Sequence, residues 1–258
     1  MTLQADVRAF APGRVNLIGE HTDHTGGRCL PMAVTMGVHV DGRREGDRVL
    51  LSSHEVPGTV DVALDVQAPE RVEPAWGRYV AGVVAELRPS VGLTGGVRSD
   101  VPVGAGMSSS AALEVAVALA LGFGGSVEDL ARTCQAAEQR ASGVPCGILD
   151  QLASAAGRDG HAFVLDCTTL ERTFVPVPDA VEVRVVHSGQ ERTLAGSAYA
   201  DRRSECEAAE AEIGPLRTAS LGDVAGIADG VLRRRARHVV TENQRVLDAA
   251  EALRAADL

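Results

Sequence analysis

The sequence contains no lysine, so every one of the 25 positions counted as lysine or arginine is an arginine. A P-loop lysine, the strand lysine of protein kinases and a Schiff-base lysine are therefore all excluded. Any phosphate group that this protein handles must be bound by backbone N–H groups, by arginine and by a metal ion.

Other absences narrow the class of protein. No apolar run of about 18 residues without a charge occurs, which predicts that no segment spans a membrane. The first six residues lack the basic and apolar regions of a secretory signal. The five cysteines form no CxxC pair, which favours a reduced, cytoplasmic protein without a disulfide or metal framework. The net charge of -10 leaves no basic excess to neutralise the phosphates of a nucleic acid. We also expect a monomer whose partner is a small molecule.

The 258 residues, 45% of them apolar, fit a globular chain of one large domain or two modest ones. Ser126 and Asp129 form a capping-box pattern at the start of a helix, and Gly143 ends that helix. Residues 111–121 are apolar almost all round, which predicts a buried helix, and the chain is mostly helical from residue 194 onward. Strand patterns occupy residues 34–40, 49–53, 59–66, 161–166, 172–177 and 181–187.

A segment rich in glycine and serine, residues 101–110, links a strand pattern to the apolar helix. Gly104 and Gly106 let the backbone turn tightly and approach a ligand closely. The serines Ser108–Ser110 stand where the helix begins, with its unpaired N–H groups and its positive dipole end. Such a helix start can bind a polyphosphate without lysine, although the serines can equally serve only as helix caps.

Two carboxylates lie in positions that require a partner. Glu138 falls on or beside the apolar stripe of its helix, where it must either bind a cation such as Mg²⁺ or form a structural ion pair with arginine. Asp150 follows a proline–glycine turn near the start of a further apolar run. It is either a charge in a helix cap region or a base that accepts the proton of a sugar hydroxyl during phosphoryl transfer.

Near the N-terminus, residues 12–23 place Arg14, Glu20, His21 and Asp23 beside an apolar run. The two acids and the histidine can form a hydrogen-bond set for a polyhydroxylated ligand. One histidine with spaced acids is thin support for a zinc site. A polar turn without function is the third reading of the same residues.

Together these segments resemble the signature regions of galactokinases, which belong to the GHMP kinases. The resemblance covers roughly residues 8 to 250 and rests on five blocks that follow the order of the family. They are residues 12–23 with 30–33, residues 103–115, residues 145–151, residues 196–199 ahead of Arg202 and Arg203, and residues 237–243.

The resemblance implies an α+β, two-lobed GHMP kinase fold that transfers the γ-phosphate of ATP to the anomeric hydroxyl of galactose. Asp150 resembles the catalytic base, and Arg14 the cation that keeps it ionised and steadies the phosphoryl group. Ser110 and Glu138 resemble the Mg²⁺ ligands, and Trp76 the adenine-side tryptophan. The ATP loop comprises Gly104, Ala105, Gly106, Met107, Ser108, Ser109 and Ser110. The sugar contacts comprise Glu20, His21, Asp23 and Tyr199, with backbone near Gly147.

The chain departs from the family pattern in two places. His24 stands where galactokinases usually carry tyrosine, directly after Asp23, which leaves open another sugar such as a galactosamine derivative or arabinose. The family's later glycine-rich motif does not occur, so we expect a truncated C-terminal lobe, with an N-terminal lobe at residues 1–178 and a partial second lobe at residues 179–258. That truncation also leaves open a non-catalytic sensor of sugar and ATP.

Overall fold

The computed structural model describes residues 6–102, 104–186 and 198–256. The chain folds into two compact units, each built from separate stretches of sequence. Among the described residues, the first unit holds residues 6–14 and 34–156, and the second holds residues 15–33, 157–186 and 198–256. The lobe boundary predicted between residues 178 and 179 is not among these borders and stays a prediction.

The first unit contains a sheet in the order β1-β3-β6-β4-β5. In β4 and β5, buried and accessible residues alternate, as the two-residue period of a half-buried strand requires. β3 pairs antiparallel with β6 and β5 pairs antiparallel with β4, whereas β4 runs parallel to β6. The strands are β1 (Asp6–Asn16), β3 (Pro31–Arg43), β4 (Arg48–Ser53), β5 (Thr59–Ala63) and β6 (Leu93–Ser99).

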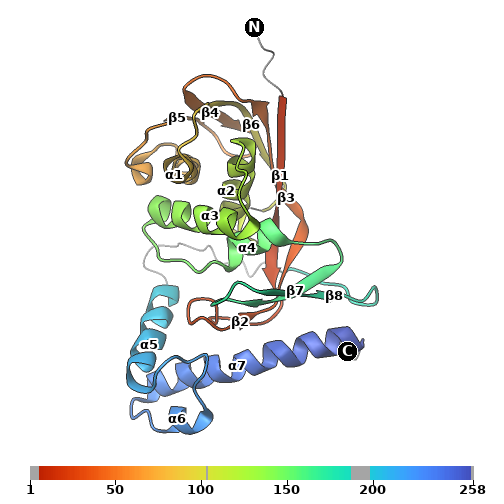
Figure 1. Ribbon diagram of the computed structural model, residues 1–258, viewed down its shortest axis with the longest axis vertical. Helices are drawn as coiled ribbons and strands as arrows, with labels where there is room; N and C mark the ends of the chain where they lie inside the picture. The colour runs from red at the N-terminus through yellow and green to blue at the C-terminus, as the bar shows by residue number, and fades with distance from the viewer. Residues whose placement is uncertain (1–5, 103, 187–197, 257–258) are drawn as a thin grey trace. The chain divides into compact units, whose positions relative to one another are not determined.

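Helices cover one face of this sheet, as Figure 1 shows for α1, α2 and α3. They are the short 3-10 helix η1 (Pro69–Arg71), α1 (Gly77–Leu87), α2 (Ser109–Ala120), α3 (Val127–Ser142) and α4 (Leu149–Ala156). Helix α2 is buried along nearly its whole length, as its apolar sequence predicts. Helix α3 begins with the predicted capping box of Ser126 and Asp129 and ends at Gly143 in the left-handed conformation.

The second unit contains β2 (Arg28–Cys29), β7 (His161–Asp166) and β8 (Arg172–Pro176), followed by α5 (Ala198–Ile213), α6 (Leu221–Ala225) and α7 (Gly230–Ala255). β7 pairs antiparallel with both β2 and β8 and with the first residues of β3. The long helix α7 packs against these three strands and against α5 (Figure 1). The mostly helical chain predicted from residue 194 onward is confirmed for residues 198–256.

The strand predicted at residues 181–187 is wrong for residues 181–186, which form no regular secondary structure. Val183, Val185 and Val186 are 39%, 46% and 86% exposed. A β-branched pattern forms a strand only where a neighbouring strand supplies the hydrogen-bond ladder and a buried face, and these residues have neither. His187 lies outside the described residues.

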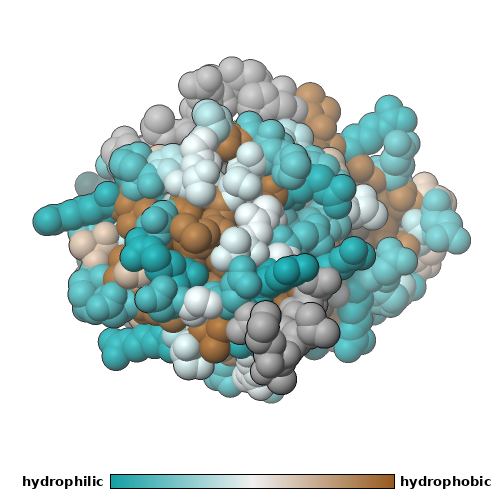
Figure 2. Space-filling model, turned by 90° about the horizontal axis from the view of Figure 1, so that it is seen from above, coloured by the Kyte–Doolittle hydropathy of each residue, from teal (hydrophilic) through white to brown (hydrophobic). Residues whose placement is uncertain are grey.

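All five cysteines are free thiols, and the sulfur atoms of Cys29 and Cys167 lie 3.7 Å apart. Within the described part of the chain, we find no helix both long and apolar enough to cross a membrane. On the face seen in Figure 2, hydrophobic residues are interspersed among hydrophilic ones.

The packing of α1 against α3 depends on a residue without a side chain. A Cβ atom at Gly82 of α1 would lie 2.5 Å from the carbonyl oxygen of Ala137 of α3. We expect Gly82→Ala to lower the free energy of unfolding by about 1–3 kcal/mol despite the roughly 1 kcal/mol that alanine gains in a helix. Urea denaturation measures the change. Gly124→Ala is the control, because nothing lies within 4 Å of its added Cβ; equal stability of the two variants would contradict the prediction.

Candidate functional site

The segment between β6 and α2 carries the predicted phosphate loop. Gly104 and Gly106 adopt φ angles of 74° and 76°, and Ser108 adopts 56°. For a residue with a side chain, this left-handed conformation costs about 1–2 kcal/mol, so the surrounding structure must hold Ser108 in place. Val103, which belongs to the same sequence block, lies outside the described residues.

The start of α2 is left open by its own N-cap residue. The side chain of Ser108 makes no capping hydrogen bond to the helix, and its hydroxyl instead donates to Oδ2 of Asp150 at 2.5 Å. The first N–H groups of an α-helix have no partner inside the helix and form the positive end of its dipole. The helix start at Ser109 and Ser110 is therefore suited to an anion such as a phosphate.

Arg14 and Asp150, distant in sequence, form an ion pair in the first unit. Arg14 Nε donates to Asp150 Oδ1 at 2.7 Å, and Arg14 Nη2 lies 2.5 Å from the same oxygen. The third guanidinium nitrogen, Nη1, donates to the carbonyl oxygen of Gly106 at 2.8 Å. The backbone N–H of Arg14 also donates to the carbonyl oxygen of Met107 at 3.1 Å. One arginine thus binds both the candidate base and the phosphate loop.

The close approach of β1 to this loop explains the residue before Arg14. A Cβ atom at Gly13 would lie 2.8 Å from the carbonyl oxygen of Met107. From the other side, the hydroxyl of Ser154 in α4 donates to the carbonyl oxygen of Pro12 at 2.7 Å. The strand end, the loop and α4 are therefore held together around Asp150, which lies in the first turn of α4.

Ser110 and Glu138, the predicted magnesium pair, are in contact. The hydroxyl of Ser110 donates to Glu138 Oε1 at 2.8 Å. Glu138 is only 6% exposed, and burial together with the charge of Asp150 raises its pKa. A cation beside this carboxylate would compensate its buried charge, so the pair fits Mg²⁺. Because the described residues contain no group of three or more metal-binding side chains, phosphate and water would supply the remaining ligands.

Trp76 and Gly147 also belong to the first unit. Trp76 is the N-cap residue of α1 and packs partly buried against the core, with a buried indole N–H that has no hydrogen-bond partner among the described residues. Gly147 lies between α3 and α4. The side-chain amides of Gln135 and Gln139 donate to the neighbouring carbonyl oxygen of Cys146 at 3.1 and 3.2 Å, which fixes that turn.

The second unit holds the other predicted sugar contacts. His21 stacks on Tyr199 of α5, with 5.6 Å between the ring centroids. His24, at the position where the sequence departs from the family, has its Nε2 atom 3.2 Å from His21 Nδ1 and its ring 5.7 Å from Tyr199. Glu20 is exposed and accepts a hydrogen bond from Asn16 Nδ2 at 2.9 Å. The structure thus brings His21 and Tyr199 together and adds His24 to them.

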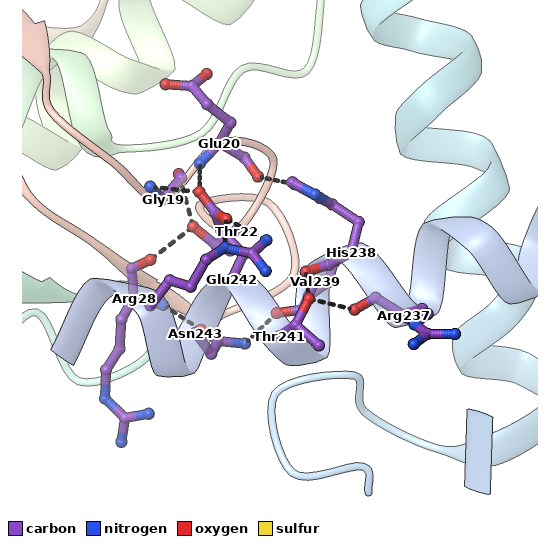
Figure 3. A network of polar contacts seen from close by, with 11 residues as sticks. Gly19, Glu20, Thr22, Arg28, Arg237, His238, Val239, Thr241, Glu242 and Asn243 are labelled. Carbon is purple, nitrogen blue, oxygen red and sulfur yellow. Dashed lines mark hydrogen bonds and ion pairs between the residues drawn. The ribbon is translucent and has the colours of Figure 1, made fainter. Parts of the chain in front are cut away.

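Helix α7 anchors the loop that carries these residues (Figure 3). Glu242 Oε1 accepts the N–H groups of Gly19 and Glu20 at 2.9 and 3.1 Å, and His238 Nε2 donates to the carbonyl oxygen of Glu20 at 2.8 Å. Asn243 Oδ1 accepts the N–H of Arg28 at 2.7 Å. Although burial acts to raise the pKa of Glu242, these backbone hydrogen bonds and Arg245 lower it overall, so the carboxylate is ionised at neutral pH.

Sequence patterns alone did not assign a role to Glu242 or Asn243, or a partner to Ser108. Glu242 and Asn243 fall on the buried stripe of α7 together with Val239 and Val246. Two polar residues on an otherwise apolar stripe are a usable signal, because buried polar groups need partners. The bond from Ser108 to Asp150 leaves no such signal, because it joins residues 42 positions apart.

Comparisons with known proteins identify the fold and the family of the chain. Residues 3–44 match the family model described as the galactokinase galactose-binding signature, and residues 78–158 match the GHMP kinases N terminal domain. The solved structure of Lactococcus lactis galactokinase complexed with galactose superposes with a TM-score of 0.86 at 32% identity, covering 97% of this chain and 70% of that one. The mevalonate kinase of Methanococcus jannaschii, at 14% identity and a TM-score of 0.55, shares the fold.

The mixed α/β fold and the glycine–serine loop define a GHMP kinase, as predicted. A galactokinase of Roseiflexus sp. is 42% identical over 266 residues, and one of Exiguobacterium sibiricum is 38% identical over 268 residues. In both comparisons the match covers 96% of this chain and 68% of the relative. The chain belongs to the galactokinase family and is a sugar kinase.

The two histidines of the second unit predict a pH dependence. Burial lowers the pKa of His21 and lowers that of His24 from 6.5 to about 4. Since the unfolded chain then binds more protons than the folded chain between about pH 6.5 and 4, the free energy of unfolding falls as the pH drops through this window. We expect the free energy of unfolding of His24→Phe to fall less than that of the wild type over this pH range. Urea denaturation at several pH values measures the difference.

The matched control for this series is His54→Phe, because His54 is exposed. This variant should keep the decline of the wild type, since its ring loses little solvent on folding. A decline of the same size in the wild type and in His24→Phe would contradict the assignment of a half-buried His24 with a lowered pKa.

Proposed function

We propose that this chain transfers the γ-phosphate of ATP to the anomeric hydroxyl of galactose, giving galactose 1-phosphate and ADP. The observation that carries the proposal is the contact set of Arg14, which binds the carboxylate of Asp150 and the carbonyl oxygen of Gly106 at the open start of α2. Family membership supports the substrate, since the galactokinase of Lactococcus lactis was solved complexed with galactose.

The candidate base is Asp150. Its carboxylate accepts one hydrogen bond from Nε of Arg14 and one from Ser108, and Nη2 of Arg14 forms an ion pair with it. An ionised carboxylate offers about four acceptor positions, and these contacts occupy three of them. The remaining position suits the anomeric hydroxyl. As the bond from the sugar oxygen to phosphorus forms and the bond from phosphorus to the ADP oxygen breaks, the hydroxyl proton passes to Asp150 and from there to solvent.

Without lysine, the phosphate groups are bound by dipoles and by arginine. The N–H groups of the loop from Gly104 to Ser110 and of the start of α2 supply preorganised donors, and Arg14 adds a fixed positive charge. Ser110 and Glu138 would hold Mg²⁺, which when bound neutralises charge on the phosphate oxygens. Trp76 would lie on the adenine side.

On the acceptor side, the sugar hydroxyls bind to Glu20, His21, Asp23 and Tyr199, with backbone near Gly147. The anchoring of residues 19 and 20 by Glu242 supports this part of the proposal, because a hydroxyl-binding loop must be held rigidly to select one sugar. The proposed partner is a small-molecule sugar, and we propose that the chain acts as a cytoplasmic monomer.

A different acceptor sugar is favoured by one observation. His24 contacts His21 and lies beside Tyr199, so a residue that departs from the family pattern touches the proposed sugar contacts. Galactosamine, N-acetylgalactosamine and arabinose therefore belong in the same assay as galactose. If one of these sugars gave a higher kcat/KM than galactose, that sugar would be the substrate in place of galactose, and the proposed kinase mechanism would be unchanged.

The test of the mechanism is Asp150→Asn in a coupled assay of ADP release with galactose. General-base catalysis contributes about 10²–10⁴-fold, and we expect kcat to fall by a factor in this range. Asp159→Asn, which changes an exposed aspartate, is the control and should keep the wild-type kcat. Equal turnover by wild type and Asp150→Asn would remove the base assignment, and a wild type without any sugar-dependent turnover would favour a sensor of sugar and ATP.

A further inference from the structure

A buried glutamine connects the candidate magnesium ligand to a second carboxylate. Gln151 of α4 has no exposed surface, and its Nε2 atom donates to Glu138 Oε2 at 2.6 Å and to Glu114 Oε2 at 3.1 Å. The side-chain amide carries two N–H bonds, and the two carboxylates take one each. Glu138 is thereby held through Oε1 by Ser110 and through Oε2 by Gln151.

Glu114 is an unusual residue for its position. It lies one turn after Ser110 on α2, has no exposed surface, and its helix neighbours are alanine, leucine and valine. A buried carboxylate is costly, and an apolar residue of similar size would pack there more favourably. The Oε1 atoms of both Glu114 and Gln151 lack a hydrogen-bond partner among the described residues. Packing and folding stability therefore do not explain why the chain carries Glu114.

The charge of Glu114 follows from its surroundings. Burial and the nearby charge of Glu138 raise the pKa of Glu114 well above its usual value, which favours the neutral, protonated carboxyl group. A neutral Glu114 accepts from Gln151 without adding a second negative charge beside Glu138. Its role can then be filled by any neutral side chain of the same shape that accepts a hydrogen bond, which is a property that an experiment can test.

We propose that Gln151, oriented by Glu114, is a positioning residue that fixes the carboxylate of Glu138 beside Ser110 and so sets how tightly the magnesium–nucleotide complex binds. The inference rests on the proposed function, because it assigns Glu138 and Ser110 to that complex. Gln151 directly follows Asp150, so the same helix that carries the candidate base also orients the candidate metal ligand.

The experiment measures nucleotide binding by calorimetry, with a non-hydrolysable ATP analogue, in the presence and in the absence of Mg²⁺. The measured quantity is the ratio of the two dissociation constants. Residues that orient metal ligands typically change metal affinity by about 10–100-fold. We expect Gln151→Leu and Glu114→Leu to reduce the gain in affinity from Mg²⁺ about tenfold while leaving the magnesium-free affinity and the KM for galactose unchanged.

Two further variants make the result specific. Glu114→Gln keeps the shape of the side chain and an acceptor oxygen. Its gain in nucleotide affinity from Mg²⁺ should stay within about threefold of the wild-type gain, since removing a residue that orients a metal ligand typically costs about 10-fold or more in affinity. Gln244→Leu changes an exposed glutamine of α7 and should leave the ratio unchanged. Urea denaturation of each variant establishes that it is folded.

Several outcomes would overturn the proposal. An unchanged magnesium gain in Gln151→Leu would do so, as would an equal loss of affinity with and without Mg²⁺, which is the sign of a merely structural role. A loss in Glu114→Gln as large as that in Glu114→Leu would overturn the part played by a neutral Glu114. If the wild-type chain phosphorylates galactose and one of these results is found, only the inference about Gln151 and Glu114 is overturned. If the wild-type chain binds no nucleotide, the proposed function is overturned as well.

Discussion

The ion pair of Arg14 and Asp150 is the contact on which the candidate site depends. Three nitrogens of one guanidinium bind two different acceptors, the carboxylate of Asp150 and the carbonyl oxygen of Gly106. These contacts join the end of β1, the glycine–serine loop and the first turn of α4. Because the arginine side chain is only 14% exposed, its charge needs a nearby carboxylate. Removing either partner would leave the other charge without its ion-pair partner.

Because the chain contains no lysine, Arg14 is the candidate residue that supplies the side-chain positive charge at this site. A guanidinium is planar and presents several donors in fixed directions, so it can hold a carboxylate and a carbonyl group at once, whereas an ammonium group acts as a compact point charge. The N-terminus of helix α2 supplies a second centre of positive charge. Its N-cap residue Ser108 makes no capping hydrogen bond and donates its hydroxyl to Asp150 instead. The strained φ of Ser108 accompanies that hydrogen bond, and strain held by surrounding contacts is typical of functional sites.

Local features of the sequence predicted much of the fold. The capping residues of α3, the apolar surface of α2 and the alternation in β4 and β5 each depend on residues close together in the chain. Residues 181–186 show the limit of such reasoning, because whether a β-branched run becomes a strand depends on a neighbour far away in the sequence. The lobe boundary near residue 178 rested on one short proline-containing stretch, and compactness divides the chain differently.

For the candidate site, the sequence motifs named most of the candidate residues but not the contacts that these residues make. The pairs Arg14 with Asp150 and Ser110 with Glu138 followed from the family resemblance, and the structure places both in hydrogen-bond contact. The bridge of Gln151 between two carboxylates and the capture of residues 19 and 20 by Glu242 join positions that are remote in the chain. No local pattern specifies such partners, since each side chain is satisfied only by the folded backbone around it.

A double-mutant cycle on the central ion pair tests the whole arrangement most directly. The kcat/KM for galactose would be measured for wild type, Arg14→Gln, Asp150→Asn and the variant with both changes. If the two residues act as one unit, each single change costs nearly as much as the double change. The coupling free energy then approaches the loss from one single change, about 3–5 kcal/mol for a 10²–10⁴-fold effect. Strictly additive losses, with a coupling of about zero, would show that Arg14 and Asp150 act independently and would contradict the central role of this ion pair.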